Sequence, residues 1–254
     1  MAEKSNSTEM FRAIIVIFAT VSTIAFNALA AAGLVNGITP DAVSDKYPTV
    51  VTPAGYAFTI WSVIYLGMIG FSVYQALPFK LAEFRSVRTI YVLSCVLNCG
   101  WIYFWHRDQI GICLAIILAL LVTLLLLCVK FKTSDSVRDA LFTKVPFGVY
   151  FGWVTCAAIV NFVIFLTYSG ANMSSSASTI LGCVCIVAAA ACAILVRWKL
   201  TNYLYPMAVA WALTAIAVKQ SGNTPIVLAA AFAVVTCFVT TGSVVTNLKD
   251  STSE

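Results

Sequence analysis

The feature that most constrains this chain is a series of long, uninterrupted apolar runs, of which Ile110 to Val129 is the clearest. A helix needs roughly 20 mostly apolar residues to cross a bilayer, whereas outer-membrane barrel strands alternate apolar and polar residues in shorter segments. Of the 254 residues, 61% are hydrophobic and 10% are charged, whereas soluble domains are about 25% charged. The sequence therefore predicts an all-α, polytopic membrane protein.

Eight apolar segments are predicted to cross the membrane, and they leave little chain for a soluble domain. They cover residues 13–35, 54–77, 89–106, 110–129, 146–168, 178–196, 203–218 and 224–246. The polar, uncharged stretch Ser169–Ala177 is predicted to be a hinge between a five-helix unit at 13–170 and three additional helices at 178–246. Short polar tails at 1–12 and 247–254 complete the expected organisation.

The placement of basic residues predicts the orientation of the spans, because Lys and Arg concentrate in cytoplasmic loops. If successive loops alternate between the two sides, one side holds Lys46, Arg107 and Lys219. The other side holds the remaining twelve of the 15 basic residues: Lys4, Arg12, Lys80, Arg85, Arg88, Lys130, Lys132, Arg138, Lys144, Arg197, Lys199 and Lys249. We therefore expect both termini to be cytoplasmic, in a membrane that the sequence does not identify.

The first span has an alternative interpretation as a cleaved signal peptide, because the small-residue run Ala28-Leu29-Ala30 ends its apolar stretch. Glu3 and Glu9 weaken that interpretation, since the start of a signal peptide is usually net positive. The loop that follows, Asn36–Thr52, contains two prolines and is the longest non-cytoplasmic connection. It is either an ordinary connector or a segment that folds over the mouth of a cavity.

Several kinds of chemistry are not supported by the sequence. No Asp, Glu, Lys or Arg lies in the middle of a span, so proton pumping and carboxylate-driven symport are not expected. The nine cysteines lie in apolar runs as small buried residues, and His106 is the only histidine, so no metal site is expected. We find no nucleophile–base pair, phosphate loop or dinucleotide motif, and therefore no catalytic residue. Nucleic acid is not an expected partner.

Aromatic and amide side chains recur in the spans at intervals of three and four residues, which places them on shared helix faces. One interpretation is helix packing held by asparagine hydrogen bonds, with aromatic rings at the membrane interface. The other is an aromatic-lined pocket for a flat hydrophobic ligand. The residues concerned are Phe58, Trp61 and Tyr65, then Asn98, Trp101 and Trp105, and finally Tyr150, Trp153, Ala157 and Asn161.

Span five also carries a motif that favours close helix contact. Gly148 and Gly152 are separated by three residues near its start. Small residues at this spacing let two backbones approach each other in a membrane. The spacing therefore permits another helix to approach the fifth span closely, although the motif is a common one.

Three stretches of the chain resemble the TspO/MBR family of tryptophan-rich sensory proteins and translocator proteins. PAGYAFTIWSVIY at 53–65 is similar to the proline-led second helix of the family. LNCGWIYFWHRDQIG at 97–111 is similar to its third helix, and YFGWVTCAAIVN at 150–161 to its fifth. The chain also departs from the family pattern in two places. Its first loop contains Tyr47 but no tryptophan, whereas the family's first loop is usually rich in tryptophan. The family's sterol-recognition motif is absent, because no basic residue follows Thr167-Tyr168-Ser169.

The resemblance implies a five-helix bundle that binds tetrapyrroles and other hydrophobic ligands in a pocket capped by the first loop. Trp61 and Trp153 would then be the paired pocket tryptophans, and Ala157 the small residue of the pocket wall. A porphyrin or haem would be a bound ligand, with no cofactor required. The lipid bilayer and a hydrophobic small molecule are the expected partners, and the three additional helices would serve dimerisation, as in a homodimer, or transport.

Two functions of other classes stay open beside this one. An eight-helix transporter or permease for an apolar solute needs no charge within the membrane, and a structural protein without a ligand would use the aromatic faces only for packing. An enzyme is the weakest interpretation. Members of the family have been proposed to break down porphyrins through the pocket tryptophans, and the residues of this chain add no other catalytic group.

Overall fold

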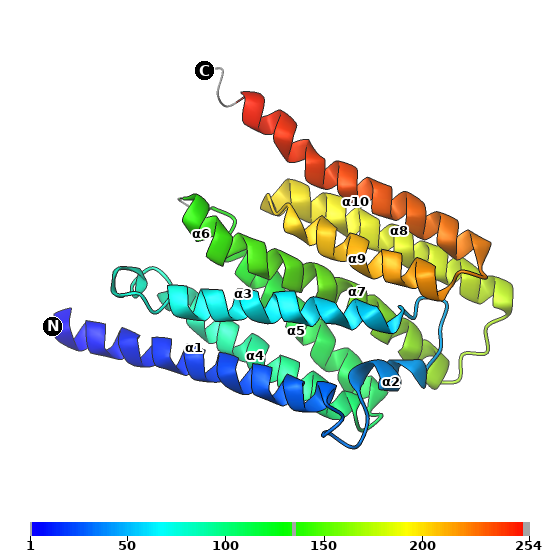
Figure 1. Cartoon of the computed structure of the whole chain (residues 1–254), viewed down its shortest axis with the longest axis horizontal. Coiled ribbons are helices and arrows are strands. Elements are labelled where there is room, and N and C mark those ends of the chain that lie inside the picture. Colours follow the sequence, from blue (N-terminus) through cyan, green and yellow to red (C-terminus); the bar gives the residue numbers. More distant parts are fainter. Residues whose placement is uncertain (1, 134–135, 251–254) are drawn as a thin grey trace. The chain divides into compact units, whose positions relative to one another are not determined.

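A computed structural model describes residues 2–133 and 136–250, with side chains for 7–133 and 136–243. Within these residues the chain is helical and has no strand (Figure 1). The elements are α1 (Ala2–Ala31), α2 (Pro40–Asp45), the 3-10 helix η1 (Gly55–Thr59), α3 (Ile60–Tyr74), the 3-10 helix η2 (Pro78–Lys80), α4 (Arg85–Trp105), α5 (Ile110–Lys130), α6 (Val137–Phe142), α7 (Lys144–Tyr168), α8 (Ser175–Leu200), α9 (Leu204–Lys219) and α10 (Thr224–Asp250).

The eight predicted spans correspond to α1, to η1 with α3, and to α4, α5, α7, α8, α9 and α10. Seven helical segments of the described chain are long and apolar enough to cross a membrane, and α9 is a shorter apolar helix of 16 residues. The all-α polytopic fold is therefore confirmed. Helix α1 begins at Ala2, so the predicted tail at 1–12 is helical from that residue, and its place outside the membrane stays a prediction; of the tail at 247–254, residues 251–254 lie outside the described residues.

The helices group into two compact units. Unit 1 consists of residues up to 43 together with 61–147, and unit 2 of residues 44–60 together with 148–254. The first loop thus leaves unit 1 and continues into unit 2, and the chain passes back into unit 1 within the second span. The expected boundary between a five-helix unit and three additional helices stays a prediction.

In unit 1, α4 packs against both α1 and α5 (Figure 1). A buried hydroxyl cluster joins α1, α3 and α4: Thr20 Oγ1 lies 2.5 Å from Ser72 Oγ and 2.6 Å from Tyr91 Oη. Polar groups within a membrane need partners in the protein, and these three hydroxyls supply one another. The fully buried ring of Phe71 lies beside them and contacts Tyr91 with ring centroids 4.9 Å apart.

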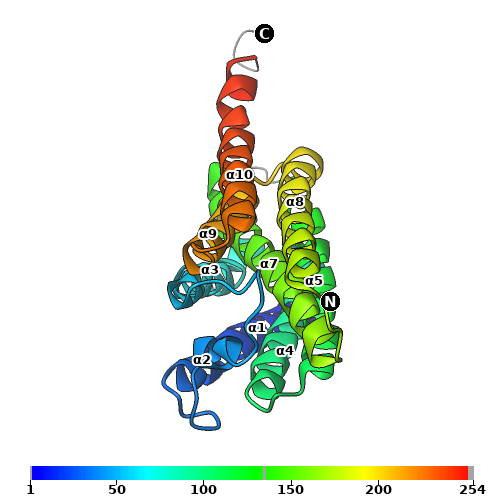
Figure 2. The same ribbon diagram turned by 90° about the vertical axis from the view of Figure 1, so that its right-hand side faces the viewer.

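In unit 2, helices α8, α9 and α10 lie side by side in both views (Figures 1 and 2). Helix α8 begins where the hydroxyl of Ser174 accepts a hydrogen bond from the backbone N–H of Ala177, which caps its first turn. It ends at Thr201, whose φ of 50° turns the chain into α9.

Helix α7 approaches α9 closely at the predicted glycine pair. A Cβ atom on Gly152 would lie 2.6 Å from the carbonyl oxygen of Tyr205, and one on Gly148 would overlap the side chain of Asn202. The Tyr205 hydroxyl then donates to Thr155 Oγ1 at 2.7 Å. The close approach permitted by the Gly-x-x-x-Gly spacing is therefore present, and it buries a polar contact beside it.

Candidate functional site

The aromatic residues of the second span form a stacked pair in unit 1. Trp61 and Tyr65 lie one turn apart on α3, with ring centroids 5.6 Å apart and planes inclined by 21°. Both residues are half-buried. Two residues of the predicted face therefore stack on α3, whereas the third, Phe58, lies in η1.

The predicted face of the third span, which carries Trp101 and Trp105, is used for packing within unit 1. Trp101 and Trp105 stack with centroids 5.3 Å apart, and both residues are buried. The Trp105 indole N–H donates to the carbonyl oxygen of Pro40 at 3.1 Å, and Asn36 Nδ2 donates to the His106 carbonyl at 2.7 Å. These bonds attach the first half of the first loop to the end of α4.

Each of the two asparagines of the predicted site makes a hydrogen bond, Asn98 with another asparagine and Asn161 with the backbone. Asn27 Nδ2 donates to Asn98 Oδ1 at 2.8 Å, which joins α1 to α4 in the interior of unit 1. Asn161 Nδ2 donates to the carbonyl of Ala157, one turn earlier on α7, at 2.9 Å. The Asn27–Asn98 bond is the interhelical contact expected from amides in a membrane. It also ties α1 into unit 1.

Unit 2 contains the remaining predicted residues. The half-buried ring of Phe58 meets the buried ring of Trp153 edge-on, with centroids 5.8 Å apart. Tyr150 is 1% exposed on the same helix as Trp153, and Ala157 is half-buried. The structure thus brings Phe58 to Trp153, while Trp61 belongs to unit 1. A pocket shared by Trp61 and Trp153 stays a prediction.

The second half of the first loop is held by α9 within unit 2. Lys219 Nζ lies 2.8 Å from Asp45 Oδ1, and Gln220 Nε2 donates to the Thr49 carbonyl at 2.9 Å. Further along the segment, the Ala54 N–H donates to the Ala215 carbonyl at 3.0 Å. The second half of this loop is therefore fixed by contacts at the end of α9, and a role as the cover of a cavity stays a prediction.

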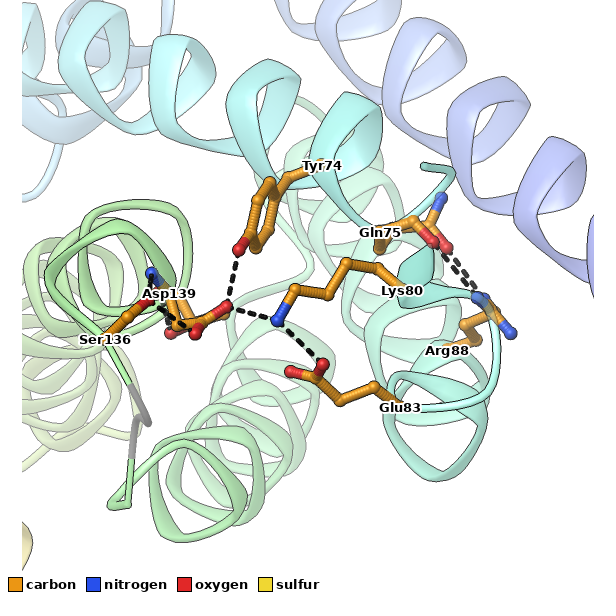
Figure 3. Close-up of polar contacts among 8 residues, drawn as sticks. Tyr74, Gln75, Lys80, Glu83, Arg88, Ser136 and Asp139 are labelled. Atoms are coloured by element: carbon orange, nitrogen blue, oxygen red, sulfur yellow. Dashed lines mark hydrogen bonds and ion pairs between the residues drawn. The ribbon is translucent and has the colours of Figure 1, made fainter. Parts of the chain in front are cut away.

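A polar cluster at one end of unit 1 was not predicted from the sequence (Figure 3). Lys80 Nζ lies 2.6 Å from Asp139 Oδ1 and 2.7 Å from Glu83 Oε2. The Tyr74 hydroxyl and the Ser136 hydroxyl also donate to the Asp139 carboxylate, at 2.5 and 2.7 Å. Because Lys80 and Asp139 are 59 residues apart, only the fold brings them together.

The electrostatics of this cluster favour the charged form of Lys80. Burial alone would lower the pKa of its ammonium group, but the hydrogen bonds and charges of Asp139 and Glu83 raise that pKa above its ordinary value. A cavity of about 180 Å³ beside the cluster is lined by Glu83, Lys130 and Asp139 among others. The cluster joins η2 to α6, and so links two of the loops predicted to be cytoplasmic.

A second buried charge group joins α1, α3 and α4 in unit 1. Arg88 is 2% exposed, and its guanidinium lies 2.6 Å from the carboxylate of Glu9 and donates at 2.7 Å to Gln75 Oε1 (Figure 3). Arg85 Nε lies 2.7 Å from the same Glu9 carboxylate. The signal in the sequence was the position of Glu9 and Arg88 at the starts of two spans, on one predicted side.

No group of His, Cys, Asp and Glu that could hold a metal occurs among the residues whose positions are described. All nine cysteines are free thiols, buried or half-buried, as their apolar surroundings predict. His106 is fully buried at the end of α4, where its Nδ1 lies 2.8 Å from the Ile102 carbonyl.

Long apolar helices, hydrogen-bonded amides between them and clustered aromatic rings define a polytopic α-helical integral membrane protein. A comparison with known protein families identifies the family within this class. The model of the family described as TSPO-like protein matches residues 13–243, and the chain belongs to that family. The match includes the three C-terminal helices. No curated protein and no solved structure matches the chain.

Proposed function

We propose that this protein binds a flat, hydrophobic molecule of the tetrapyrrole class on its aromatic helix faces, for sensing, sequestration or carriage of that molecule. Membership of the TSPO-like family supports the ligand class, because the related tryptophan-rich proteins bind such molecules. The ligand is cargo or signal in this proposal, and the protein requires no cofactor. The lipid bilayer delivers the ligand.

The observation that carries the proposal is the stacked pair of Trp61 and Tyr65. Its rings are nearly parallel and half-buried, so they present a flat surface on which a planar ligand can stack. Trp105 differs from this pair, because it is 2% exposed and its indole N–H donates a hydrogen bond to the Pro40 carbonyl. Trp61 and Tyr65 are therefore half-buried, whereas Trp105 packs within unit 1; Trp153, which is 4% exposed, is assigned to the ligand by the family resemblance.

Access to the ligand would be controlled by the loop at 36–52. Its first half is bonded to the end of α4 and its second half to α9. Opening would break the exposed Asp45–Lys219 ion pair first, because exposed pairs contribute little, typically about 0–1 kcal/mol. The excess of basic residues on one side supports a topology with both termini cytoplasmic and this loop on the opposite side.

The proposal is tested by titrating the purified protein with protoporphyrin IX in detergent, with Trp61→Ala/Trp153→Ala beside it. Porphyrin absorbance and tryptophan fluorescence quenching are both followed, because the chain has six tryptophans. The matched control is Trp198→Ala, which removes a tryptophan that is 78% exposed. Saturable binding that the double variant loses and the control keeps is the expected result. Equal titrations of all three proteins would overturn the proposal.

A further inference from the structure

Unit 2 contains a cavity that lies apart from the predicted aromatic residues. It has a volume of about 490 Å³ and sits where α7 ends, α8 begins and α9 ends. Thr49 and Val50 of the first loop line it, together with Val163 of α7 and Leu181 of α8. This volume is in the range of small-molecule sites, roughly 300–1,000 Å³.

The chemistry of the lining is uncharged. Hydroxyl and amide groups, among them Thr49, Asn172 and Gln220, share the wall with aliphatic side chains, and no Asp, Glu, Lys or Arg lines it. A charged ligand group would lose its hydration here without gaining an opposite charge. A hydroxyl or carbonyl group on the ligand could instead exchange hydrogen bonds with these neutral side chains.

A separate apolar void is lined by residues that neighbour those of the cavity along the same helices. A small void of about 10 Å³ is lined by Val51, Val160, Cys185 and Ile216 among others, all of them without a charged or amide group. Val160, Cys185 and Ile216 lie about one helical turn deeper than Val163, Leu181 and Gln220, which line the outer cavity. Its lining offers no partner for a water molecule, so the interior beside the cavity is apolar.

We propose that this cavity is a second ligand site, which takes an uncharged amphipathic lipid such as a long-chain alcohol. The neutral head group lies at the mouth, near Thr49 and Asn172, and the hydrocarbon chain points toward the apolar void. The loop segment at 48–50 forms part of its roof, held in place by the hydrogen bond from Gln220 to the Thr49 carbonyl. The site goes beyond the tetrapyrrole proposal, since it uses the C-terminal helices and none of the predicted tryptophans.

The test uses photoreactive lipids of one chain length that carry a hydroxyl, a carboxylate or a trimethylammonium head group. The full-length protein is labelled in detergent, and the labelled peptides are identified by mass spectrometry. The expected result is saturable labelling by the alcohol around 48–51 and 160–181, about tenfold above either charged lipid at equal concentration. Equal labelling by the three lipids, or labelling spread over all helices, would overturn the proposal.

Two pairs of variants make the test specific. Leu181→Trp fills the cavity and is expected to abolish the saturable labelling, whereas Ile180→Trp, at a residue that is 65% exposed, keeps it. Asn172→Lys changes an exposed loop residue at the mouth and is expected to shift the preference to the carboxylate, with Asn172→Gln as its control. Unchanged labelling in Leu181→Trp, or an unchanged preference in folded Asn172→Lys, would contradict the site.

The Trp61→Ala/Trp153→Ala variant separates this proposal from the first one. The alcohol site is expected to keep its labelling in that variant, because none of its lining residues is altered. Loss of porphyrin binding with retained alcohol labelling supports two separate sites. Loss of alcohol labelling in the folded double variant would show that the two ligands share one site, and would overturn the second-site proposal alone.

Discussion

At the scale of single residues, buried polar side chains in this protein find their partners on neighbouring helices. The Asn27–Asn98 amide pair and the hydroxyl cluster around Thr20 lie among apolar helices, where water is not available to replace a lost partner. An asparagine in a span can therefore be explained by packing alone. For Asn98, the structure supports packing over ligand contact as its main role.

Replacement of Asn98 by alanine is expected to lower stability in detergent without weakening porphyrin binding. The coupling energy between Asn27→Ala and Asn98→Ala should be about 0.5–2 kcal/mol, as for other hydrogen bonds between transmembrane helices. A double-mutant cycle of unfolding free energies measures it. Additive losses from the two substitutions would show that the hydrogen bond does not stabilise the protein.

At the scale of elements, two kinds of contact hold the helices and loops together. Close approach of α7 to α9 depends on Gly152, where a side chain would meet the backbone of Tyr205. The loops of unit 1 are joined differently, through the Lys80–Asp139 ion pair between η2 and α6. The close approach of α7 to α9 could be predicted from residue spacing. The Lys80–Asp139 ion pair could not, because its two residues are far apart in the sequence.

Substitution of Gly152 by leucine is expected to destabilise the protein by about 1–3 kcal/mol, because the close crossing leaves no room for a side chain. The control is Gly242→Ala in α10, where an added Cβ meets nothing within 4 Å. That control should be neutral or slightly stabilising, since alanine favours a helix over glycine. Thermal unfolding of both variants measures the difference, and equal effects would contradict the crossing.

The Lys80 cluster predicts a specific dependence on pH. Since the folded state raises the pKa of Lys80 above its ordinary 10.5, its stabilisation is complete below pH 10.5 and is lost only as the pH rises toward the raised pKa. The difference in Tm between wild type and Lys80→Met should therefore be constant from about pH 7 to pH 10. Lys130→Met, at an exposed residue, controls for loss of charge. A difference that already shrinks between pH 8 and pH 10 would contradict the ion pair.

At the scale of the whole molecule, the apolar runs predict the helices closely, because burial in a bilayer demands continuous apolar segments. The fifth segment, predicted at 146–168, is α7 at Lys144–Tyr168, and the fourth, predicted at 110–129, is α5 at Ile110–Lys130. The short helices α2 and α6 were not predicted, since six residues are too few for a periodic apolar pattern. Helix α1 begins at Ala2, before the predicted span, and it carries the buried Glu9 that bonds Arg88 on α4.

The candidate site could be predicted only in part. Helical spacing places Trp61 beside Tyr65, since neighbours on one helix follow from sequence alone. The same spacing does not predict the hydrogen bond from Trp105 to the Pro40 carbonyl or the ring contact between Phe58 and Trp153, because those contacts join different segments. The neutral cavity in unit 2 likewise arises from three separate stretches of the chain, at 48–50, at 163–181 and at Gln220, none of which carries a recognisable motif.

The central claim is that Trp61 and Trp153 both serve a tetrapyrrole-class ligand, and single substitutions test it most directly. The dissociation constant of protoporphyrin IX is measured for Trp61→Leu and for Trp153→Leu, because leucine keeps apolar bulk and removes the ring. The account predicts that each variant binds about tenfold more weakly than wild type, while Trp198→Leu binds equally well. Wild-type affinity in either of the two folded variants, or an equal loss in Trp198→Leu, would contradict it.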